Sequence, residues 1–503
     1  MRRFKNFICA MLLASLMIFA ATVEAAELVI LHTNDIHARV LNTDDGGKSM
    51  GLAEMVAAIK TLKSQNKNNL WLYEGDTFNG MPAINISKCE NMLTLLNIAG
   101  LNAMTPGNHD FNYGIDGLLN LNKKAKFDII AANVVYKDND KLILTPYKIY
   151  NLSGLKVGVF GLATPETAYK ARPSFLSKVK FLNPYEVAKN MVKTLRPKCD
   201  VIIALTHLGV LESSEFNSVT LAKEVDGIDL IVDGHSHTLL PAGLTINDTL
   251  IVQTGAHAYN LGKTTIELDG KKITSIRAEL LDADAVKKIN PTPDKNITAA
   301  IKSYERANKK IFNQVVAKNE IDLPFDISLI RTQETELGDL VADAFRWRTG
   351  ADIAVINSGG IRSGIPKGNV TYGDAIAIFP FGNQLQVVEI QGKLIREMLE
   401  NGVSEYPDTA GKFLQVSGIR FEFLSKNHVG NRIGKIFVNN APLDDNKLYT
   451  LAATDFMIEG GDGYDCLKKL LVIGKFGTLE EVLIEYLQEV GIKNIDTGRI
   501  IRR

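Results

Sequence analysis

A short apolar run that is followed at once by polar side chains recurs five times in the first half of this 503-residue chain. Each run has the length and composition of a buried β-strand. The runs cover residues 28–31, 70–73, 103–105, 201–205 and 230–232, and they lead into His32–His37, Glu74–Asp76, Pro106–Asp110, Thr206–His207 and Asp233–His237.

Helical patterns lie between these strands, for example over Leu52–Lys63 and Tyr185–Leu195. Strands that alternate with helices favour a layered α/β domain. In such domains ligands bind at the carboxyl ends of the strands. Because the polar motifs stand at those ends, we expect them to form the functional site.

The length of the chain allows two domains, and the pattern changes near residues 282–310. Pro291 and Pro293 interrupt the chain, and a charged, solvated helix is expected over Asn296–Lys310. A second α/β unit begins at Val315. We therefore expect an α/β domain over residues 26–290, a linker helix over 291–314 and a smaller α/β domain over 315–503.

The N-terminus has the pattern of a secretory signal peptide over residues 1–25. Arg2, Arg3 and Lys5 precede an apolar run from Phe7 to Ala21, and small residues follow at the expected cleavage site. An uncleaved membrane anchor is the alternative, but the run is short for a bilayer. No later stretch reaches about 18 consecutive apolar residues, so we expect no further membrane span. The expected location is the periplasm, the cell envelope or the medium.

Composition excludes some classes of partner and of scaffold. The 57 basic and 57 acidic side chains balance, and removal of residues 1–25 leaves a net charge near −2. Nothing in this charge suggests nucleic acid as a bulk partner. Beyond the signal segment only Cys89, Cys199 and Cys466 remain, so we expect at most one disulfide. The oligomeric state stays open.

The polar motifs together predict a two-metal centre. Divalent metals need converging carboxylate oxygens and neutral imidazole nitrogens, and two metals about 3.5–4 Å apart usually share a bridging ligand. Each residue alone has an ordinary role: an aspartate can cap a helix, and an asparagine often lies in a turn. As a set, they are expected to bind metal: Asp35, His37, Asp76, Asn108, His207, His235 and His237.

The motifs Asp-x-His, Gly-Asp, Gly-Asn-His-Asp, Thr-His and Gly-His-Ser-His, in this order, resemble the calcineurin-like metallophosphoesterases. The resemblance implies that one metal is held by Asp35, His37, Asp76 and His237. The other would be held by Asp76, Asn108, His207 and His235, with Asp76 bridging. It also implies hydrolysis by in-line attack of activated water on phosphorus. Mixed oxygen and nitrogen ligands suit zinc, manganese, cobalt or iron, and the choice stays open.

The resemblance gives a catalytic role to His109, which would face the phosphate and stabilise charge or assist the leaving group. The related enzymes usually read Gly-Asn-His-Glu-Phe-Asp, where the last aspartate orients the histidine. This chain reads Gly-Asn-His-Asp-Phe-Asn. Either Asn112 orients His109 through a neutral hydrogen bond, or Asp110 takes over. The same variation resembles cyclic-nucleotide phosphodiesterases.

The second half resembles the nucleotide-binding domain of 5′-nucleotidases and UDP-sugar hydrolases, so the resemblance covers nearly all of residues 26–503. Arginines suit phosphate oxygens, and aromatic rings can stack on a base. The resemblance implies phosphate contacts from Arg331 and Arg362, a base sandwich from Phe381 and Phe456, and base or ribose contacts from Asn383 and Asp462. In this family the two domains rotate relative to each other.

The expected function is exported, two-metal hydrolysis of nucleoside 5′-monophosphates, with UDP-sugars or nucleoside diphosphates as further substrates. A 2′,3′-cyclic nucleotide phosphodiesterase is the alternative within the same chemistry. A non-catalytic nucleotide-binding protein of the envelope is the alternative outside it. That last alternative is disfavoured because every expected metal position is retained.

Overall fold

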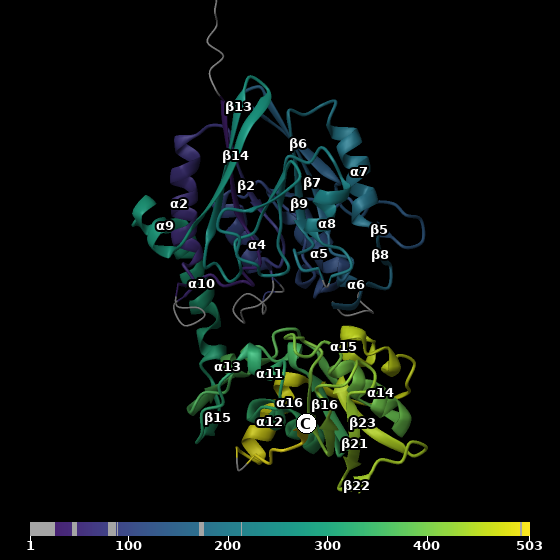
Figure 1. The fold of residues 1–503 in the computed structure, drawn as a ribbon. Coiled ribbons are helices and arrows are strands. Elements are labelled where there is room, and N and C mark those ends of the chain that lie inside the picture. The colour runs from purple at the N-terminus through teal and green to yellow at the C-terminus, as the bar shows by residue number, and fades with distance from the viewer. Residues whose placement is uncertain are drawn as a thin grey trace, which may run out of the picture.

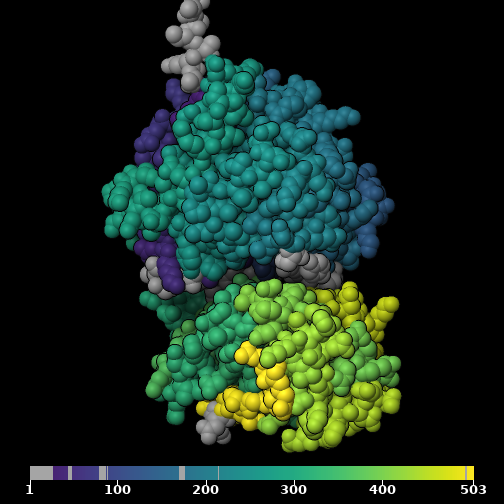
Figure 2. Space-filling model, in the orientation of Figure 1, coloured from purple at the N-terminus to yellow at the C-terminus, as the bar shows by residue number. Residues whose placement is uncertain are grey.

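The computed structural model forms two lobes, which Figure 1 shows as ribbons and Figure 2 as packed atoms. It describes residues 26–42, 48–78, 87, 89–170, 176–212, 214–492 and 495–503. The expected signal peptide lies outside these residues. Within them, no helix combines the length and apolarity needed to cross a membrane. The three cysteines Cys89, Cys199 and Cys466 are free.

The N-terminal lobe stacks two six-stranded sheets face to face. One has the order β14-β13-β1-β2-β3-β4 and the other β11-β12-β10-β9-β7-β6. The bounds in the first are β1 Ala26–Thr33, β2 Asn69–Tyr73, β3 Ala103–Met104, β4 Asp128–Ile129, β13 Leu261–Asp269 and β14 Lys272–Leu281. In the second they are β6 Tyr147–Leu152, β7 Leu155–Ala163, β9 Val201–His207, β10 Leu230–Val232, β11 Leu244–Ile246 and β12 Thr249–Val252. The predicted strands are therefore confirmed.

Alternation along the strands explains the layers of this lobe. Leu28 and Ile30 of β1 pack between the two sheets, whereas Val29 and Leu31 face helices. The helices α2 (Leu52–Gln65), α4 (Glu90–Ala99) and α5 (Gly114–Lys124) cover the first sheet. The second sheet is covered by α7 (Pro184–Leu195) and α8 (Ser218–Glu224). This layered arrangement is the α/β class that the sequence predicts.

Parallel pairing brings the strand ends together. The pairs β1–β2, β2–β3, β7–β9 and β9–β10 are all parallel. The carboxyl ends of β1, β2 and β3 therefore share one edge of the first sheet, and those of β9 and β10 share one edge of the second. The polar motifs follow these ends.

The helix between the lobes, α10 (Lys295–Phe312), is anchored at its start on the N-terminal lobe. Ile297 and Ile301 are buried in the core cluster beneath α2 and α4. At the same end, Lys60 Nζ lies 2.6 Å from Asp294 Oδ2. The far end of α10 packs against α13 (Tyr372–Ile378) of the C-terminal lobe. Only the later turns of this helix thus bridge the lobes.

The C-terminal lobe is built on a five-stranded sheet with the order β19-β16-β23-β18-β24. Helices α12 (Glu336–Thr349) and α16 (Leu479–Glu489) cover one face, while α14 (Gly392–Gly402) and a second sheet, β22-β21-β20-β25, cover the other. The strand bounds are β16 Ile353–Asn357, β18 Gln384–Gln391, β19 Leu414–Ser417, β20 Ile419–Phe423, β21 Ile433–Val438, β22 Ala441–Pro442, β23 Leu448–Thr454, β24 Val472–Thr478 and β25 Ile500–Arg502.

Candidate metal centre

The structure brings all seven predicted metal ligands to one end of the N-terminal lobe. They lie on the loops after β1, β2, β3 and β10, and at the last residue of β9. His37 Nε2 is 3.2 Å from His237 Nε2, and His237 Nε2 is 3.5 Å from Asp35 Oδ1. Asp76 Oδ2 lies 3.4 Å from His207 Nε2 and 4.0 Å from His37 Nε2. The carboxylate of Asp76 thus stands between two groups of ligands, as a bridging ligand must.

The loops that carry these ligands adopt a backbone that side-chain-bearing residues rarely use. Five of the seven have positive φ, at Asp35 (49°), His37 (47°), Asp76 (51°), His235 (78°) and His237 (53°). Such conformations persist where surrounding contacts fix them, and they cluster at functional sites. Close packing explains a glycine beside them, because a Cβ on Gly107 would lie 2.3 Å from Asp76 Oδ1.

Two of the predicted ligands, Asp35 and His207, are held at one end so that the other end faces the centre. Asp35 Oδ2 accepts hydrogen bonds from Asn34 Nδ2 (2.7 Å) and from the His235 main-chain N–H (2.9 Å). His207 Nδ1 is bonded to the main-chain oxygen of Glu74. Three buried atoms, Asp35 Oδ1, Asn108 Oδ1 and His207 Nε2, then lack a well-aligned hydrogen-bond partner among the described residues. Buried atoms of this kind fit a metal ion.

Electrostatics also favour a cation at this position. Burial lowers the pKa of His207, but Asp76 and Asp35 outweigh burial and raise that pKa to about 10. Burial raises the pKa of Asp76, but His207 and His109 lower it well below the usual range. A buried imidazole that is stabilised as a cation indicates a strongly negative cage. Its oxygen and nitrogen donors match the ligand types of divalent transition metals.

His109 contacts Asn112 and not Asp110. Asn112 Nδ2 lies 3.2 Å from His109 Nδ1. The Asp110 carboxylate instead accepts main-chain N–H groups of Thr77 (3.0 Å), Phe78 (2.9 Å) and Gly107 (2.8 Å). Asp110 therefore shapes the loops around Asp76, and the amide of Asn112 is the neighbour that can orient His109. Burial lowers the pKa of His109 to about 4.

The C-terminal lobe places an aromatic ring and a guanidinium over this centre. The Phe381 ring stacks on His109, with centroids 5.3 Å apart and planes 13° apart, and Arg362 Cζ lies 5.6 Å from the Phe381 centroid. Burial, Arg331 and Arg39 lower the pKa of Arg362 to about 9. Asp76 acts on Arg362 in the opposite direction. Buried guanidinium groups close together fit an anion such as phosphate.

The other predicted substrate residues lie near this pair but are less directly placed. Asp462 Oδ2 accepts from Asn357 Nδ2 (2.8 Å), and its charge acts on Arg331. The Phe456 ring packs closely over Gly461. Asn383 is buried, and its main-chain oxygen accepts from Leu479 N–H (3.2 Å). Among the described residues, Phe381 stacks on His109 and not on Phe456.

Two residues at the centre were missed by sequence reasoning. His257 has one ring nitrogen within 4.8 Å of a ring nitrogen of both His37 and His237. Glu166 Oε2 lies 2.9 Å from His235 Nε2. Both residues follow a strand, since β12 ends at Val252 and β7 at Ala163. The strand-end pattern could have revealed them, but their motifs lack the ligand spacing of the others.

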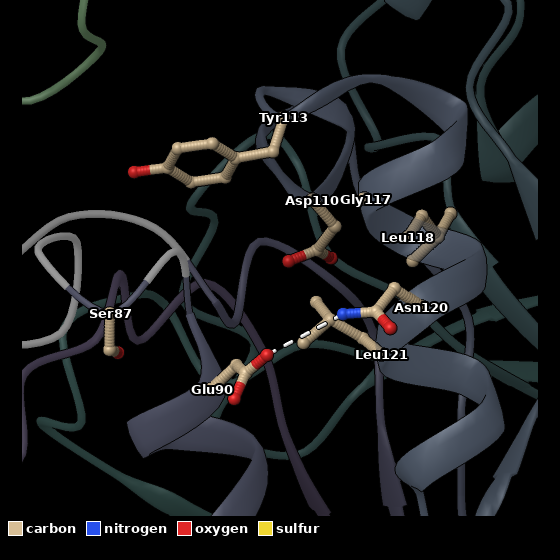
Figure 3. A pocket seen from close by; sticks show the side chains of 8 residues that line it. All are labelled: Ser87, Glu90, Asp110, Tyr113, Gly117, Leu118, Asn120 and Leu121. Atoms are coloured by element: carbon tan, nitrogen blue, oxygen red, sulfur yellow. Dashed lines mark hydrogen bonds between the residues drawn. The ribbon is translucent and has the colours of Figure 1, made fainter.

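A cavity of about 370 Å³ lies beside the centre, between α4 and α5. Figure 3 shows Glu90, Asn120 and Tyr113 around it, with Asp110 on one wall. None of the seven predicted metal ligands lines it. His109, which follows the predicted ligand Asn108, instead contacts the C-terminal lobe through Phe381.

The chain is similar to known phosphoesterases in sequence and in fold. Residues 28–239 match the calcineurin-like phosphoesterase model, and residues 315–469 match the model of the 5′-nucleotidase C-terminal domain. A solved 5′-nucleotidase precursor from Thermus thermophilus is 31% identical, with a TM-score of 0.81, and the match covers 95% of this chain and 99% of that one.

Curated relatives match over most of this chain. A 5′-nucleotidase of Vibrio parahaemolyticus is 28% identical, over 87% of this chain and 84% of that protein. A trifunctional nucleotide phosphoesterase of Bacillus subtilis is 30% identical over 93% of this chain. The chain spans only 34% of the length of that relative.

Proposed function

This chain belongs to the 5′-nucleotidase family, and from that premise we propose that it hydrolyses nucleoside 5′-monophosphates to nucleoside and phosphate. UDP-sugars and nucleoside diphosphates are further substrates in this proposal, and residues 1–25 export the enzyme. The observation that supports it most is the contact between Phe381 and His109. It supports the proposal because the Phe381 ring, a candidate surface for a base, lies against the predicted metal centre.

The proposed metal ligands are those of the sequence analysis. Asp35, His37, Asp76 and His237 would hold one ion, and Asp76, Asn108, His207 and His235 the other. When bound, two such ions supply Lewis acidity toward phosphoryl oxygens and activate water. The protein supplies the counter-charge for the phosphate through Arg331 and Arg362. Phe381 and Phe456 would hold the base, while Asn383 and Asp462 would bond its edge or the ribose.

His109 would act as a neutral hydrogen-bond donor. Its lowered pKa keeps the imidazole uncharged near neutral pH. If the Asn112 amide donates to Nδ1, the proton of His109 lies on Nε2. That N–H can then donate to an oxygen of the phosphate ester. A carboxylate at position 112 would instead favour the charged imidazolium.

A second candidate function is 2′,3′-cyclic nucleotide phosphodiesterase. The observation that favours it is the contact between His109 and an amide where the related nucleotidases carry a carboxylate. An amide neighbour does not raise the pKa of His109 as a carboxylate would. The pKa of a general acid determines which leaving alkoxide it can assist, so this difference at position 112 favours a different phosphate ester.

Steady-state rates separate these functions, with phosphate release measured for AMP and chromatography of the nucleotide products for UDP-glucose and 2′,3′-cAMP, because opening the cyclic diester releases no phosphate. We expect the purified protein to turn over AMP efficiently, with UDP-glucose as a slower substrate. Negligible AMP hydrolysis beside fast cleavage of 2′,3′-cAMP would select the second candidate. No turnover of any nucleotide by protein with two bound metal ions would establish the non-catalytic alternative.

A single variant tests the metal assignment. Asp76→Ala removes the ligand shared by the two sites, so bound metal and hydrolysis should be lost together. His428, an exposed residue in the loop between β20 and β21, supplies the control. We expect His428→Ala to retain both properties. Unchanged hydrolysis by the Asp76 variant would refute the assignment.

A further inference from the structure

We propose that His257 is a further ligand of the metal held by Asp35, His37, Asp76 and His237, so that this site carries three imidazoles. The inference rests on the two-metal centre of the proposed function and adds a residue to it. His257 lies in the loop between β12 and β13, outside the five motifs that predicted the centre.

The three histidines converge from separate segments of the chain. The His257 ring centroid is 5.7 Å from that of His37 and 5.7 Å from that of His237. One nitrogen from each of the three rings lies within 4.8 Å of the other two. Nitrogen atoms about 2.1 Å from a zinc ion lie about 3.4 Å apart in a tetrahedral site. A contraction of about 1 Å around an ion would therefore bring all three into its coordination sphere.

The backbone of His257 has the conformation shared by the predicted ligands. Its φ is 60°, and that of Ala258 is 57°. Five of the seven predicted ligands have positive φ as well, so His257 belongs to the same group of strained loop residues. Two consecutive residues of this kind without glycine are unfavourable unless other contacts fix them.

Such contacts tie the His257 loop to the Asp35 loop. The His257 main-chain N–H donates to the main-chain oxygen of Asp35 (2.8 Å). Asn34 Nδ2 donates to the Gly255 oxygen (2.6 Å), and Asn34 Oδ1 accepts from Thr254 N–H (2.8 Å). The residue next to the ligand Asp35 therefore holds the loop that carries His257. This arrangement keeps the third imidazole beside the first two.

A third imidazole strengthens the preference of the site for transition metals. Carboxylate and water ligands suit magnesium, calcium and manganese, whereas imidazole suits zinc, iron, copper and nickel. With His257, nitrogen donors outnumber the two carboxylates of Asp35 and Asp76. We therefore expect this site to select zinc or a similar transition metal over magnesium and calcium.

Metal binding provides the test, with activity as a separate measurement. His257→Phe keeps an aromatic ring and removes the nitrogen donors, and His257→Ala serves as a second variant. His428→Ala is the matched control. For each metal-free protein, competition with a chromophoric chelator gives the zinc affinity of both sites, and the visible absorption of the cobalt-loaded form reports its coordination. Circular dichroism identifies any variant that fails to fold.

We expect wild type and His428→Ala to bind two zinc ions alike. In the His257 variants one of the two affinities should fall by roughly 10–100-fold or more, since even outer contacts to metal ligands contribute that much. The cobalt spectrum should change as well. Unchanged affinities with an unchanged spectrum would overturn the proposal. So would a rise in KM alone, which would indicate a contact with substrate.

The outcome is distinguishable from failure of the proposed function. If the wild type binds two metal ions but releases no phosphate from nucleotides, the function is wrong while the metal affinities still decide the role of His257. If AMP is hydrolysed and the His257 variants bind zinc as the wild type does, only this inference fails.

Discussion

At the scale of single residues, the metal-facing atoms depend on contacts at the other end of each side chain. Asp35 Oδ2 and His207 Nδ1 are both engaged by polar groups, which leaves Oδ1 and Nε2 for the centre. His235 follows the same rule, because Glu166 Oε2 lies 2.9 Å from its Nε2, so that Nδ1 is the nitrogen that would bind metal. A carboxylate behind a ligating histidine fixes the ring and increases its basicity.

This contact predicts that Glu166→Ala weakens one of the two metal sites. The zinc affinity of that site should fall by roughly 10–100-fold, and Glu166→Gln, which keeps an acceptor oxygen, should show a smaller loss. Chelator competition measures both. Glu186→Gln, on the exposed surface of α7, is the control. Wild-type affinity at both sites of the alanine variant would show that Glu166 does not support His235.

The sequence predicted the convergence of seven residues because their motifs follow parallel strands, whose carboxyl ends share one edge in each of the two stacked sheets. It left open whether Asp110 or Asn112 contacts His109, since both lie on the same short turn. The answer depends on the main-chain N–H groups of Thr77 and Phe78, which bind Asp110. No pattern local to residues 108–112 contains that information, because the donors are supplied by another loop.

At the scale of elements, α10 is a charged helix that is nevertheless packed into the N-terminal core at its start. The sequence suggested a solvated linker over residues 291–314, with many charged side chains. In the structure Ile297 and Ile301 lie one turn apart on the face that packs into the N-terminal core. In the sequence alone, two apolar residues in a charged helix are weak evidence that the helix packs against a core. Their significance becomes clear only once α2 and α4 are known to lie against them.

Helix α12 and the C-terminal strand β25 are joined by a buried charged cluster. Arg499 binds Asp343 through Nη1 (2.9 Å) and Nη2 (2.8 Å), and its Nη1 lies 3.7 Å from Asp339 Oδ1. Asp339 is fully buried. Burial raises its pKa to about 9 despite the opposing effect of Arg499. Glu334 lies close enough to accept a hydrogen bond from a protonated Asp339.

The raised pKa predicts how stability depends on pH. Asp339 keeps its proton in the folded state at pH values where the unfolded chain has lost it. The free energy of unfolding should therefore fall as pH rises from about 4 to about 9. Asp339→Asn removes this proton, so its stability relative to wild type should increase across the same range. Urea unfolding of both proteins at about pH 5 and about pH 9 measures the difference. A variant that is less stable at both pH values by the same amount would show that Asp339 is ionised and paired with Arg499.

At the scale of the whole molecule, the proposed substrate residues and the proposed metal ligands belong to different lobes. Figure 1 shows these two lobes. They meet where Phe381 stacks on His109. Arg362 of the C-terminal lobe also acts on two histidines of the N-terminal lobe. Burial is the main cause of the lowered pKa of His37 and of His109, and the positive charge of Arg362 lowers both further. The two lobes are therefore in contact at this point. A base can occupy the face of Phe381 that His109 covers only if the lobes or the ring move apart.

This contact predicts that Phe381 contributes to the hydrolysis of nucleotides and not to the hydrolysis of phosphate esters in general. A stacked base is worth about 1–3 kcal/mol, so Phe381→Ala should lower kcat/KM for AMP by roughly 10–100-fold. Glycerol phosphate has no base, and its hydrolysis should change little. Phe437, which is 36% exposed on β21 in the same lobe, supplies the control as Phe437→Ala. Equal losses for AMP and glycerol phosphate would mean that Phe381 acts through His109, by holding the imidazole against the metal centre, and not by stacking on the base.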